Sequence, residues 1–253
     1  MSFWNIIGFK EPYILACTGA GGKTSVLLSL IKEAQSRNIP VLLSTTTKMY
    51  YKQIMGLNPI FSNNFDEGAA RVNLHLAHEG IASWFARVEG NKVIGLPPQW
   101  LDRMIHNTKI NPYILVEADG ARGLWLKSPQ INEPLLPART KVTVGILNLQ
   151  SIGQPLTNHI VHRLDLVLSL LQKKENEIVE WQDLVLIALH KYGIFQYSQG
   201  EKILLLNGAI ADQVNNARLI AEHLKKTKAG IAKCIITEGY NEVLRLIEVH
   251  DLR

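Results

Sequence analysis

Short apolar runs alternate with amphipathic segments along almost the whole chain. The apolar runs have the length and composition of buried strands, and they span 13–19, 40–47, 113–120, 141–149, 202–208 and 231–239. The segments between them repeat apolar residues at helical spacing, and they span 23–37, 65–85, 97–107, 159–171, 181–192 and 210–226. Continuous apolar strands that alternate with helices are typical of a parallel sheet covered on both faces.

The stretch 49–110 departs from this regular alternation. It contains the predicted helix 65–85, a short predicted strand at 91–96 and a second helix that prolines open at 97–107. No internal repeat, low-complexity tract or linker interrupts the 253 residues. We therefore expect one α/β domain over 1–253 with a helical insertion at about 49–110.

Composition and charge indicate an ordinary globular protein. Hydrophobic residues make up 47% and charged residues 19% of the chain, which is enough for a sizeable core. The net charge of +5 is mild, and no basic run carries interleaved aromatic residues, so we do not expect a nucleic-acid partner. Cys17 and Cys234 are too few for a disulfide framework or a zinc site. Because we find no signal-peptide pattern and no apolar run of bilayer length, we expect a cytoplasmic protein without a membrane partner.

The stretch CTGAGGKTSV, residues 17–26, places a glycine-rich loop between the first predicted strand and the first predicted helix. A dinucleotide-binding pattern G-x-G-x-x-G that begins at Gly19 fails, because Thr24 stands where the third glycine belongs. The phosphate-binding pattern G-x-x-x-x-G-K-T has Cys17 for its first glycine, but its shorter form G-x-x-G-K-T is intact. The alternative is a glycine turn followed by a solvated lysine. The position between strand and helix favours phosphate binding.

Each residue of this loop has a physical role in phosphate binding. Glycines let backbone N–H groups approach phosphate oxygens without Cβ clashes, and the helix N-terminus adds its dipole. Lys23 would reach the β- and γ-phosphates, and the Thr24 hydroxyl would bind Mg²⁺. The candidate nucleotide-binding residues are Gly19, Ala20, Gly21, Gly22, Lys23, Thr24, Ser25 and Asn207. The predicted fold is accordingly an α/β, P-loop NTPase-like three-layer sandwich with a mostly parallel sheet and a helical insertion.

A second candidate region ends the strand YILVEADG, residues 113–120. Glu117 and Asp119 are two residues apart, so their side chains share one face of an extended strand, where they could hold the magnesium of a P-loop site. A strand end with solvated acids is the alternative. The triple threonine that ends the run 40–47 could place a hydroxyl beside the metal or could simply complete a β-branched strand. The candidate metal ligands are Thr24, Thr46, Glu117 and Asp119.

Cations follow the acidic strand. Arg122 and Lys127 could neutralise phosphate charge in a transition state, or they could be solvated surface cations. The candidate catalytic residues are Lys23, Glu117, Asp119 and Arg122. Two histidine pairs, His75 with His78 and His159 with His162, are each three residues apart and would share a helical face. No nearby cysteine or carboxylate completes a metal site with either pair, so surface or capping roles are favoured.

The base of the nucleotide is less well determined. GTPases with such loops recognise guanine with Asn-Lys-x-Asp after a late strand. Here Asn207 ends the strand 202–208, but Gly208 replaces the lysine and Asp212 comes too late for the aspartate. We therefore expect ATP, with GTP as the alternative.

The segments TGAGGKTS, LLSTTTKM, VEADGARGLWLKSP, NEPLLP and VHR together resemble the YqeC family, accessory proteins of selenium-dependent molybdenum hydroxylases. The resemblance extends from about Tyr13 to Asn207. It implies a P-loop NTP-binding protein that assists the maturation of a molybdenum-cofactor enzyme, with a molybdoenzyme or its cofactor as partner. It also implies a likeness to metallochaperone GTPases, from which Gly208 departs. The segment 49–100 carries few motif residues, so no substrate contact can be transferred there.

Three functions remain open. The first is a slow, Mg²⁺-dependent NTPase that assists cofactor maturation, with Glu117 or Asp119 on the metal and Lys23 on the γ-phosphate. The second is an ATP-dependent ligase or kinase acting on a small metabolite, because peptidoglycan-precursor ligases have a similar short loop. The third is a nucleotide-sensing scaffold without turnover, which the missing first glycine and the absent Asn-Lys-x-Asp favour.

Overall fold

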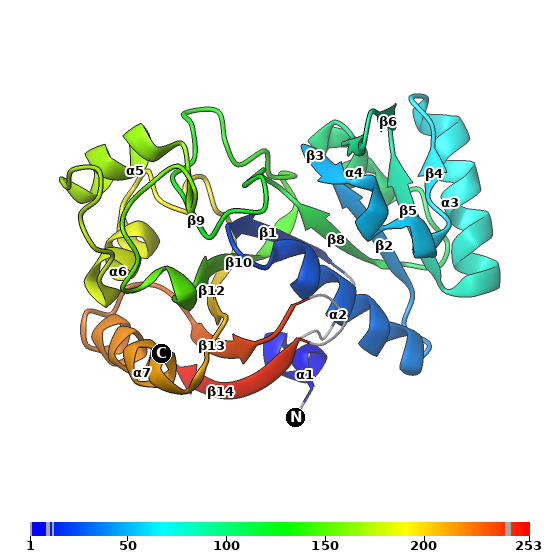
Figure 1. Cartoon of the computed structure of the whole chain (residues 1–253). Coiled ribbons are helices and arrows are strands. Elements are labelled where there is room, and N and C mark those ends of the chain that lie inside the picture. Colours follow the sequence, from blue (N-terminus) through cyan, green and yellow to red (C-terminus); the bar gives the residue numbers. More distant parts are fainter. Residues whose placement is uncertain (1, 9–10, 12, 241–243) are drawn as a thin grey trace.

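The main sheet of the computed structural model has nine strands in the order β14-β13-β12-β10-β1-β8-β2-β5-β4 (Figure 1). All its neighbouring strands are parallel except β13 and β14. The structure describes residues 2–8, 11, 13–240 and 244–253. The strands are β1 (Ile14–Gly19), β2 (Val41–Thr45), β4 (Ile60–Phe61), β5 (Ile81–Phe85), β8 (Tyr113–Glu117), β10 (Thr140–Asn148), β12 (Glu201–Asn207), β13 (Lys233–Glu238) and β14 (Arg245–Asp251). The prediction of a mostly parallel sheet is confirmed.

Helices cover both faces of this sheet. One face carries α1 (Phe3–Ile7) and α2 (Lys23–Ser36). The other face carries α3 (Phe65–Glu79) and α4 (Pro98–Met104) over one half, and α5 (Leu164–Leu171), α6 (Trp181–Leu189) and α7 (Ala211–Lys226) over the other half. The predicted three-layer α/β arrangement is therefore confirmed. None of the described helices is both long and apolar enough to span a bilayer.

The side chains of β1 show how the three layers form. Leu15 and Cys17 pack in the core cluster that contains α2, whereas Ile14 and Ala16 pack in the cluster that contains α3. All four are fully buried, because each face of the strand meets a helix. A strand buried on both faces has no polar side, and residues 14–17 are accordingly all apolar, while the Thr18 hydroxyl that follows them is satisfied by the Ile194 carbonyl.

The segment 49–110 contributes to two sheets. Its strands β5 and β4 extend the edge of the main sheet beyond β2. A separate three-stranded antiparallel sheet, here called the small sheet, has the order β3 (Lys48–Tyr50), β7 (Lys92–Ile94) and β6 (Arg87–Glu89). Figure 1 shows the small sheet at the upper right and the short strand β9 (Leu126–Lys127) with α5 at the upper left.

The helix predicted over 65–85 is too long. In the structure α3 ends at Glu79, and Gly80 adopts φ 71°, a left-handed conformation that is common after the last helical residue. The remaining stretch, Ile81–Phe85, is buried on both faces as β5, between β2 and β4. In the sequence this apolar run looks like a continuation of the helix, because five consecutive residues are too few to distinguish a buried strand from a buried helical turn.

Two more predictions needed correction. The helix predicted over 159–171 begins only at Leu164, because Val161–His162 pairs with β9 as the short strand β11. His159 and His162 therefore do not share a helical face. The strand predicted at 231–239 is also not the last, since β14 pairs with it in antiparallel orientation. The side chains of β14 are mostly half-buried, as expected of an edge strand, and that pattern lacks a continuous apolar signal.

Candidate functional site

The glycine loop, residues 19–22, connects β1 to α2 at the carboxyl edge of the main sheet. Gly19 has φ 89° and Gly21 has φ 80°. A Cβ at Gly19 would lie 2.2 Å from the carbonyl oxygen of Ile146, and one at Gly21 would lie 2.5 Å from the Asn148 Cβ atom. The loop therefore needs glycine for two reasons: its backbone is left-handed, and it packs directly on the neighbouring strand.

Two asparagines hold the loop from below. Asn148 ends β10 and Asn207 ends β12, and the two residues face each other in the register of these strands. Each side-chain amide donates a hydrogen bond to the Gly21 carbonyl, at 3.2 Å from Asn148 and 3.0 Å from Asn207. The Thr237 hydroxyl donates in turn to the Asn207 Oδ1 at 2.9 Å. The structure thus places Asn207, predicted near the base, under the loop backbone, and adds Asn148, which sequence reasoning missed.

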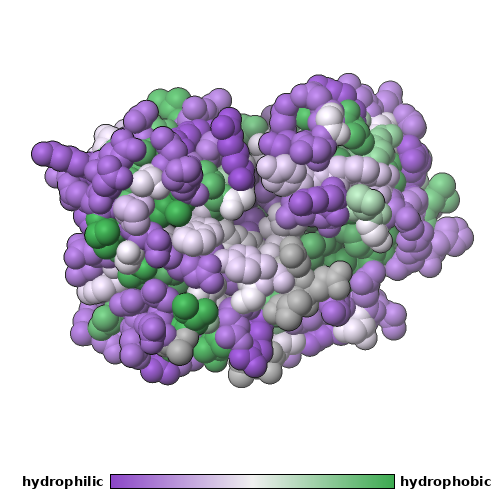
Figure 2. All heavy atoms as spheres, viewed as in Figure 1, coloured by the Kyte–Doolittle hydropathy of each residue, from purple (hydrophilic) through white to green (hydrophobic). Residues whose placement is uncertain are grey.

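A cavity of about 1160 Å³ opens where the loop meets α2. Figure 2 shows a hollow between the part of the molecule that carries β9 and α5 and the part that carries the small sheet, with hydrophilic residues on its rim. Gly21, Gly22, Lys23, Thr24 and Ser25 line it. The first turn of a helix has backbone N–H groups without intrahelical partners, and its dipole favours anions. The loop and the start of α2 therefore face the cavity with the groups that bind phosphate.

Lys23 lies at the base of the cavity, almost completely buried. Its ammonium group donates to the Gly19 carbonyl at 2.6 Å and lies 3.3 Å from the Asp119 Oδ1 atom. Burial lowers the pKa of Lys23, but the Asp119 and Glu117 carboxylates outweigh that effect, so the pKa is raised above its usual value. Lys23 is therefore cationic and held along the loop.

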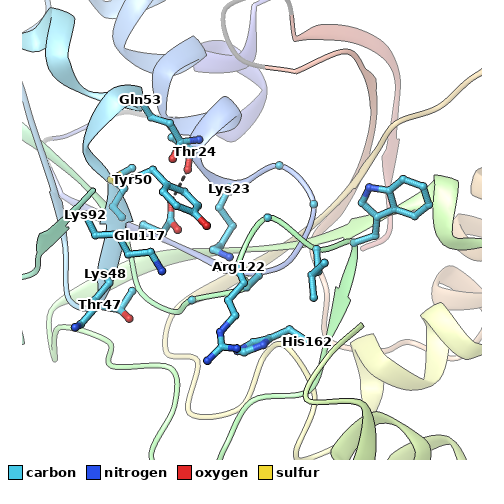
Figure 3. A pocket seen from close by; sticks show the side chains of 18 of the residues that line it. Lys23, Thr24, Thr47, Lys48, Tyr50, Gln53, Lys92, Glu117, Arg122 and His162 are labelled. Atoms are coloured by element: carbon cyan, nitrogen blue, oxygen red, sulfur yellow. Dashed lines mark hydrogen bonds between the residues drawn. The ribbon is translucent and has the colours of Figure 1, made fainter. Parts of the chain in front are cut away.

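Thr24 and Glu117 form an oxygen pair on the cavity wall (Figure 3). The Thr24 hydroxyl donates to the Glu117 Oε2 at 2.8 Å. Burial raises the pKa of Glu117, and the opposing influence of Lys23 and the Thr24 hydrogen bond does not cancel this effect. The carboxylate is thus incompletely compensated by the protein, so a cation would be stabilised beside it.

The triple threonine supports this wall from behind. The Thr45 hydroxyl donates to the Glu117 carbonyl at 2.7 Å, and the Thr46 hydroxyl donates to the Leu135 carbonyl at 2.7 Å. Thr47 lines the cavity, whereas Thr46 does not. The predicted metal ligand Thr46 therefore does not share the cavity with Thr24 and Glu117, and its hydroxyl instead holds the segment that follows β9.

Asp119 lies beneath the loop and does not line the cavity. Its Oδ2 accepts from the Gly19 N–H at 3.0 Å and lies 3.0 Å from the ammonium group of Lys127, which is fully buried. The Lys127 ammonium group also lies 3.1 Å from the Glu133 Oε2 atom. The Arg163 guanidinium donates two hydrogen bonds to the Glu133 carboxylate, at 2.5 and 2.7 Å. Asp119 is thus a fixed support of the loop at one end of a chain of alternating charges.

Arg122 and His162 lie on the far side of the cavity from Glu117 (Figure 3). Arg122 adopts φ 54°, and among the described residues it has no hydrogen-bond or ion-pair partner. His162 is kept neutral: burial, together with the cations Arg163, Lys127 and Arg122, lowers its pKa to about 4. The structure therefore brings the predicted Arg122 to the same cavity as Lys23 and Glu117, with its charge unpaired.

Sequence reasoning missed the wall that the small sheet provides. Lys48, Tyr50 and Lys92 of this sheet line the cavity, as does Gln53 in the 3-10 helix Tyr51–Gln53 that follows β3. The KMY and NKVI stretches carry no motif, and only the pairing of β3 with β7 brings them together. The described residues contain no group of three or more His, Cys, Asp or Glu that could hold a metal, so neither histidine pair forms such a site.

Comparisons with known proteins place the chain in a family. The sequence model of the YqeC protein matches residues 15–165. The chain belongs to the YqeC family. It is 26% identical over 193 residues to protein YqeC of Escherichia coli (strain K12), which covers 74% of this chain and 72% of that protein. The matched residues contain the glycine loop, the triple threonine, Glu117 and Arg122.

A solved structure, chloroplast FtsY from Physcomitrella patens, superposes with a TM-score of 0.47 and 10% identity. The alignment covers 96% of this chain and 64% of that one. A similarity of this degree carries no functional information.

Proposed function

We propose that the chain binds a nucleoside triphosphate with Mg²⁺, with the phosphates on the glycine loop. The observation that carries the proposal is the meeting of three features at one cavity. These are a left-handed glycine loop before α2, a buried cationic Lys23 and the oxygen pair of Thr24 and Glu117. Together they supply backbone donors, a cation for the terminal phosphates and ligands for a metal.

The oxygen pair fits a magnesium ion. Hydroxyl and carboxylate oxygens are hard ligands, and Mg²⁺ is commonly bound by one or two of them together with phosphate oxygens. Burial raises the pKa of Glu117, and a divalent cation beside its carboxylate would offset this effect of burial. When bound, the ion would neutralise charge on the phosphates. Thr24 and Glu117 would hold it, while Asp119 would keep the loop in place.

Two cations of the chain would act on the terminal phosphate. Lys23 would exchange the Gly19 carbonyl for phosphate oxygens, a short movement because the ammonium group already lies along the loop. Arg122 would neutralise charge from the opposite wall, since it has no partner among the described residues. Such preorganised charge stabilises the transition state of phosphoryl transfer. We therefore propose slow intrinsic hydrolysis of the nucleotide.

Equilibrium binding of fluorescent ATP and GTP analogues, with and without Mg²⁺, tests the proposal. Loss of the contacts from Lys23 to the phosphates should weaken binding about 100-fold in Lys23→Ala, the size of two charge-assisted hydrogen bonds. Lys226→Ala removes an exposed lysine of α7 and serves as the matched control, with binding unchanged. Equal binding by wild type and Lys23→Ala would refute the proposal. We expect ATP to bind more tightly than GTP, because Gly208 stands where guanine recognition needs a lysine.

Membership of the YqeC family supports a finer proposal. Nucleotide turnover in the cytoplasm would assist the maturation of a selenium-dependent molybdenum hydroxylase, with the molybdoenzyme or its cofactor as partner. Addition of the protein and ATP to the cofactor-free hydroxylase should then raise its cofactor content. Lys23→Ala should leave the content at the level without the protein. If Lys23→Ala raised the cofactor content as much as wild type does, the maturation role would not depend on nucleotide binding.

One observation favours a second candidate function, an ATP-dependent ligase or kinase. The cavity continues beyond the oxygen pair to Tyr50, Gln53 and Lys92, so it has polar surface that the phosphates on the loop do not reach. Release of ADP that requires a small acceptor would identify this activity. Turnover that no acceptor stimulates would exclude it.

A further inference from the structure

The small sheet has an apolar face and a polar face. Met49 and Val93 are buried in the core on the first. Lys48, Tyr50 and Lys92 alternate with them and line the cavity on the second, where Tyr50 and Lys92 are cross-strand partners. Two hydrogen bonds fasten this sheet to the end of β2, from the N–H groups that follow β7 to the carbonyls of Thr47 and Thr45, at 2.6 and 2.8 Å. The polar face is therefore held rigidly beside the glycine loop.

Some polar groups on and beside this face have hydrogen-bond or ion-pair partners, and others have none among the described residues. Glu89 accepts from Lys48 at 2.7 Å and from Arg87 at 3.1 Å, so both cations are paired. Lys92 has no carboxylate partner among the described residues, and its ammonium group lies 4.9 Å from the centre of the Tyr50 ring. In the same described part of the chain, the Tyr50 hydroxyl and the Gln53 side chain have no hydrogen-bond partner. Three donors thus face the cavity without an acceptor.

These donors lie next to the oxygen pair of Thr24 and Glu117. Figure 3 shows Gln53 beside Thr24, and Tyr50 and Lys92 beside Glu117, with Arg122 and His162 on the other side of Lys23. At about 1160 Å³ the cavity exceeds the range of roughly 300–1,000 Å³ that pockets for one small ligand occupy. Its lining cations are Lys23, Lys48, Lys92, Arg122 and Arg163, against the carboxylates Glu117 and Glu133. Space and positive charge therefore remain when phosphates occupy the loop.

We propose that Lys92, the Tyr50 hydroxyl and the Gln53 amide bind the oxyanion of a second small ligand, adjacent to the terminal phosphate of the nucleotide. The ligand is an organic phosphate or carboxylate. Lys92 supplies the charge, Tyr50 and Gln53 donate hydrogen bonds, and the ring of Tyr50 positions the ammonium group. The inference rests on the proposed function only in assigning the glycine loop to the nucleotide.

Titration with phenyl phosphate, followed by NMR of backbone amides, tests this subsite. Lys23→Ala is the background in which to measure it, because that variant weakens any binding of the probe at the glycine loop. Phenyl phosphate should shift amides of β3 and β7 in this background, and phenol, which lacks the dianion, should not. Adding Lys92→Ala to this background should lower the affinity for phenyl phosphate about tenfold, which corresponds to one charge-assisted hydrogen bond. Tyr50→Phe should weaken it about threefold through the lost hydroxyl.

The matched control is Arg87→Ala, which removes a cation from the same sheet that is paired with Glu89 and does not line the cavity. It should leave phenyl phosphate binding unchanged. Conversely, Lys92→Ala alone should weaken the ATP analogue far less than it weakens phenyl phosphate, because the glycine loop and Lys23 make the main contacts to the nucleotide. Equal probe affinity with and without Lys92, or equal binding of phenol, would overturn the proposal. So would a loss of ATP-analogue affinity in Lys92→Ala as large as the loss for phenyl phosphate, since it would assign Lys92 to the nucleotide.

Failure of the two proposals can be told apart. If the ATP analogue does not bind wild type but the probe still needs Lys92, the proposed function fails and the subsite stands. If the analogue binds through Lys23 and the probe is indifferent to Lys92, the subsite fails and the proposed function stands.

Discussion

Two regions of the cavity differ in how their polar side chains are paired. The floor is the glycine loop together with Asp119 and Lys127, which lie beneath it, and the wall is the polar face of the small sheet. On the floor, Asp119 is 1% exposed and is surrounded by the Gly19 N–H and the ammonium groups of Lys23 and Lys127. On the wall, Lys48 is 53% exposed, and the ammonium group of Lys92 lies over the Tyr50 ring without a carboxylate partner among the described residues. The charge of Asp119 is therefore balanced within the protein, whereas the donors of the wall lack acceptors among the described residues.

This difference indicates separate tasks. A buried ion pair fixes geometry, because breaking it leaves an uncompensated charge in a medium of low dielectric constant. A half-exposed cation exchanges water for a ligand at little cost, because it was never desolvated. We infer that the floor positions the glycine loop and that the wall selects what binds beside it. The predictions below test how far the two regions differ.

Substitution in the loop should have the largest effect. Gly19→Ala places a Cβ 2.2 Å from the Ile146 carbonyl at a residue with φ 89°. Strain and overpacking should together lower the free energy of unfolding by about 4 kcal/mol. Gly56→Ala is the control, since its Cβ would meet nothing within 4 Å, and its stability should be within about 0.5 kcal/mol of wild type. Urea unfolding measures both. Equal stability of the two variants would show that the loop is not tightly packed.

The next effect separates floor from wall directly. Asp119→Asn removes the charge that Lys23 and Lys127 share and should cost about 3 kcal/mol of unfolding free energy. Glu89→Gln removes the charge that Lys48 and Arg87 share in an exposed position and should lower the free energy of unfolding far less than Asp119→Asn does. Thermal and urea unfolding of the two variants give the comparison. If the two variants lost similar amounts of unfolding free energy, the charges of the wall would be as important for stability as those of the floor, which would contradict the comparison.

The dependence of stability on acidic pH should reveal the ion pairs that Glu133 makes with Lys127 and Arg163. Burial raises the pKa of Glu133, but Arg163 and Lys127 outweigh it and lower the pKa to about 2. A carboxyl whose folded pKa is depressed stabilises the protein above its unfolded pKa of about 4.5 and loses that contribution as pH falls toward 2. Glu133→Gln should therefore be less stable than wild type by about 2 kcal/mol near neutral pH. The gap should close as the pH is lowered in urea titrations, and a constant gap would argue against the ion pairs.

The smallest expected effect has the opposite sign. Burial raises the pKa of Glu117, so its ionised form is disfavoured by folding, and this cost is present once the pH exceeds the folded pKa. Glu117→Gln, which can still accept from Thr24, should raise the melting temperature near neutral pH by about 2 °C. It should also abolish the strengthening of nucleotide binding by Mg²⁺. A lowered melting temperature would show that Lys23 fully compensates the charge.

The sequence located the glycine loop between a strand and a helix, as the structure has it. Gly21 to Thr24 and Glu117 line the cavity, and the loop could be recognised because a glycine loop is a local feature of one strand, one turn and one helix. Their binding of phosphate and metal stays a prediction. Thr46 and Asp119 were grouped with the metal, yet both side chains face supporting contacts. Alternation along a strand shows that two side chains share a face, but their partners come from segments far away in the chain.

The sequence by itself determined the parallel sheet, the three layers and the glycine loop, because continuous apolar runs and a local turn motif need no distant contact to be recognised. Only the tertiary structure decided the wall. β3 and β7 lie more than forty residues apart in sequence, and their pairing brings Tyr50 and Lys92 together. Asn148 and Asn207 meet under Gly21 for the same reason. Short polar strands carry too weak a periodic signal to predict their partner, so the chemistry of the wall appears only once the chain has folded.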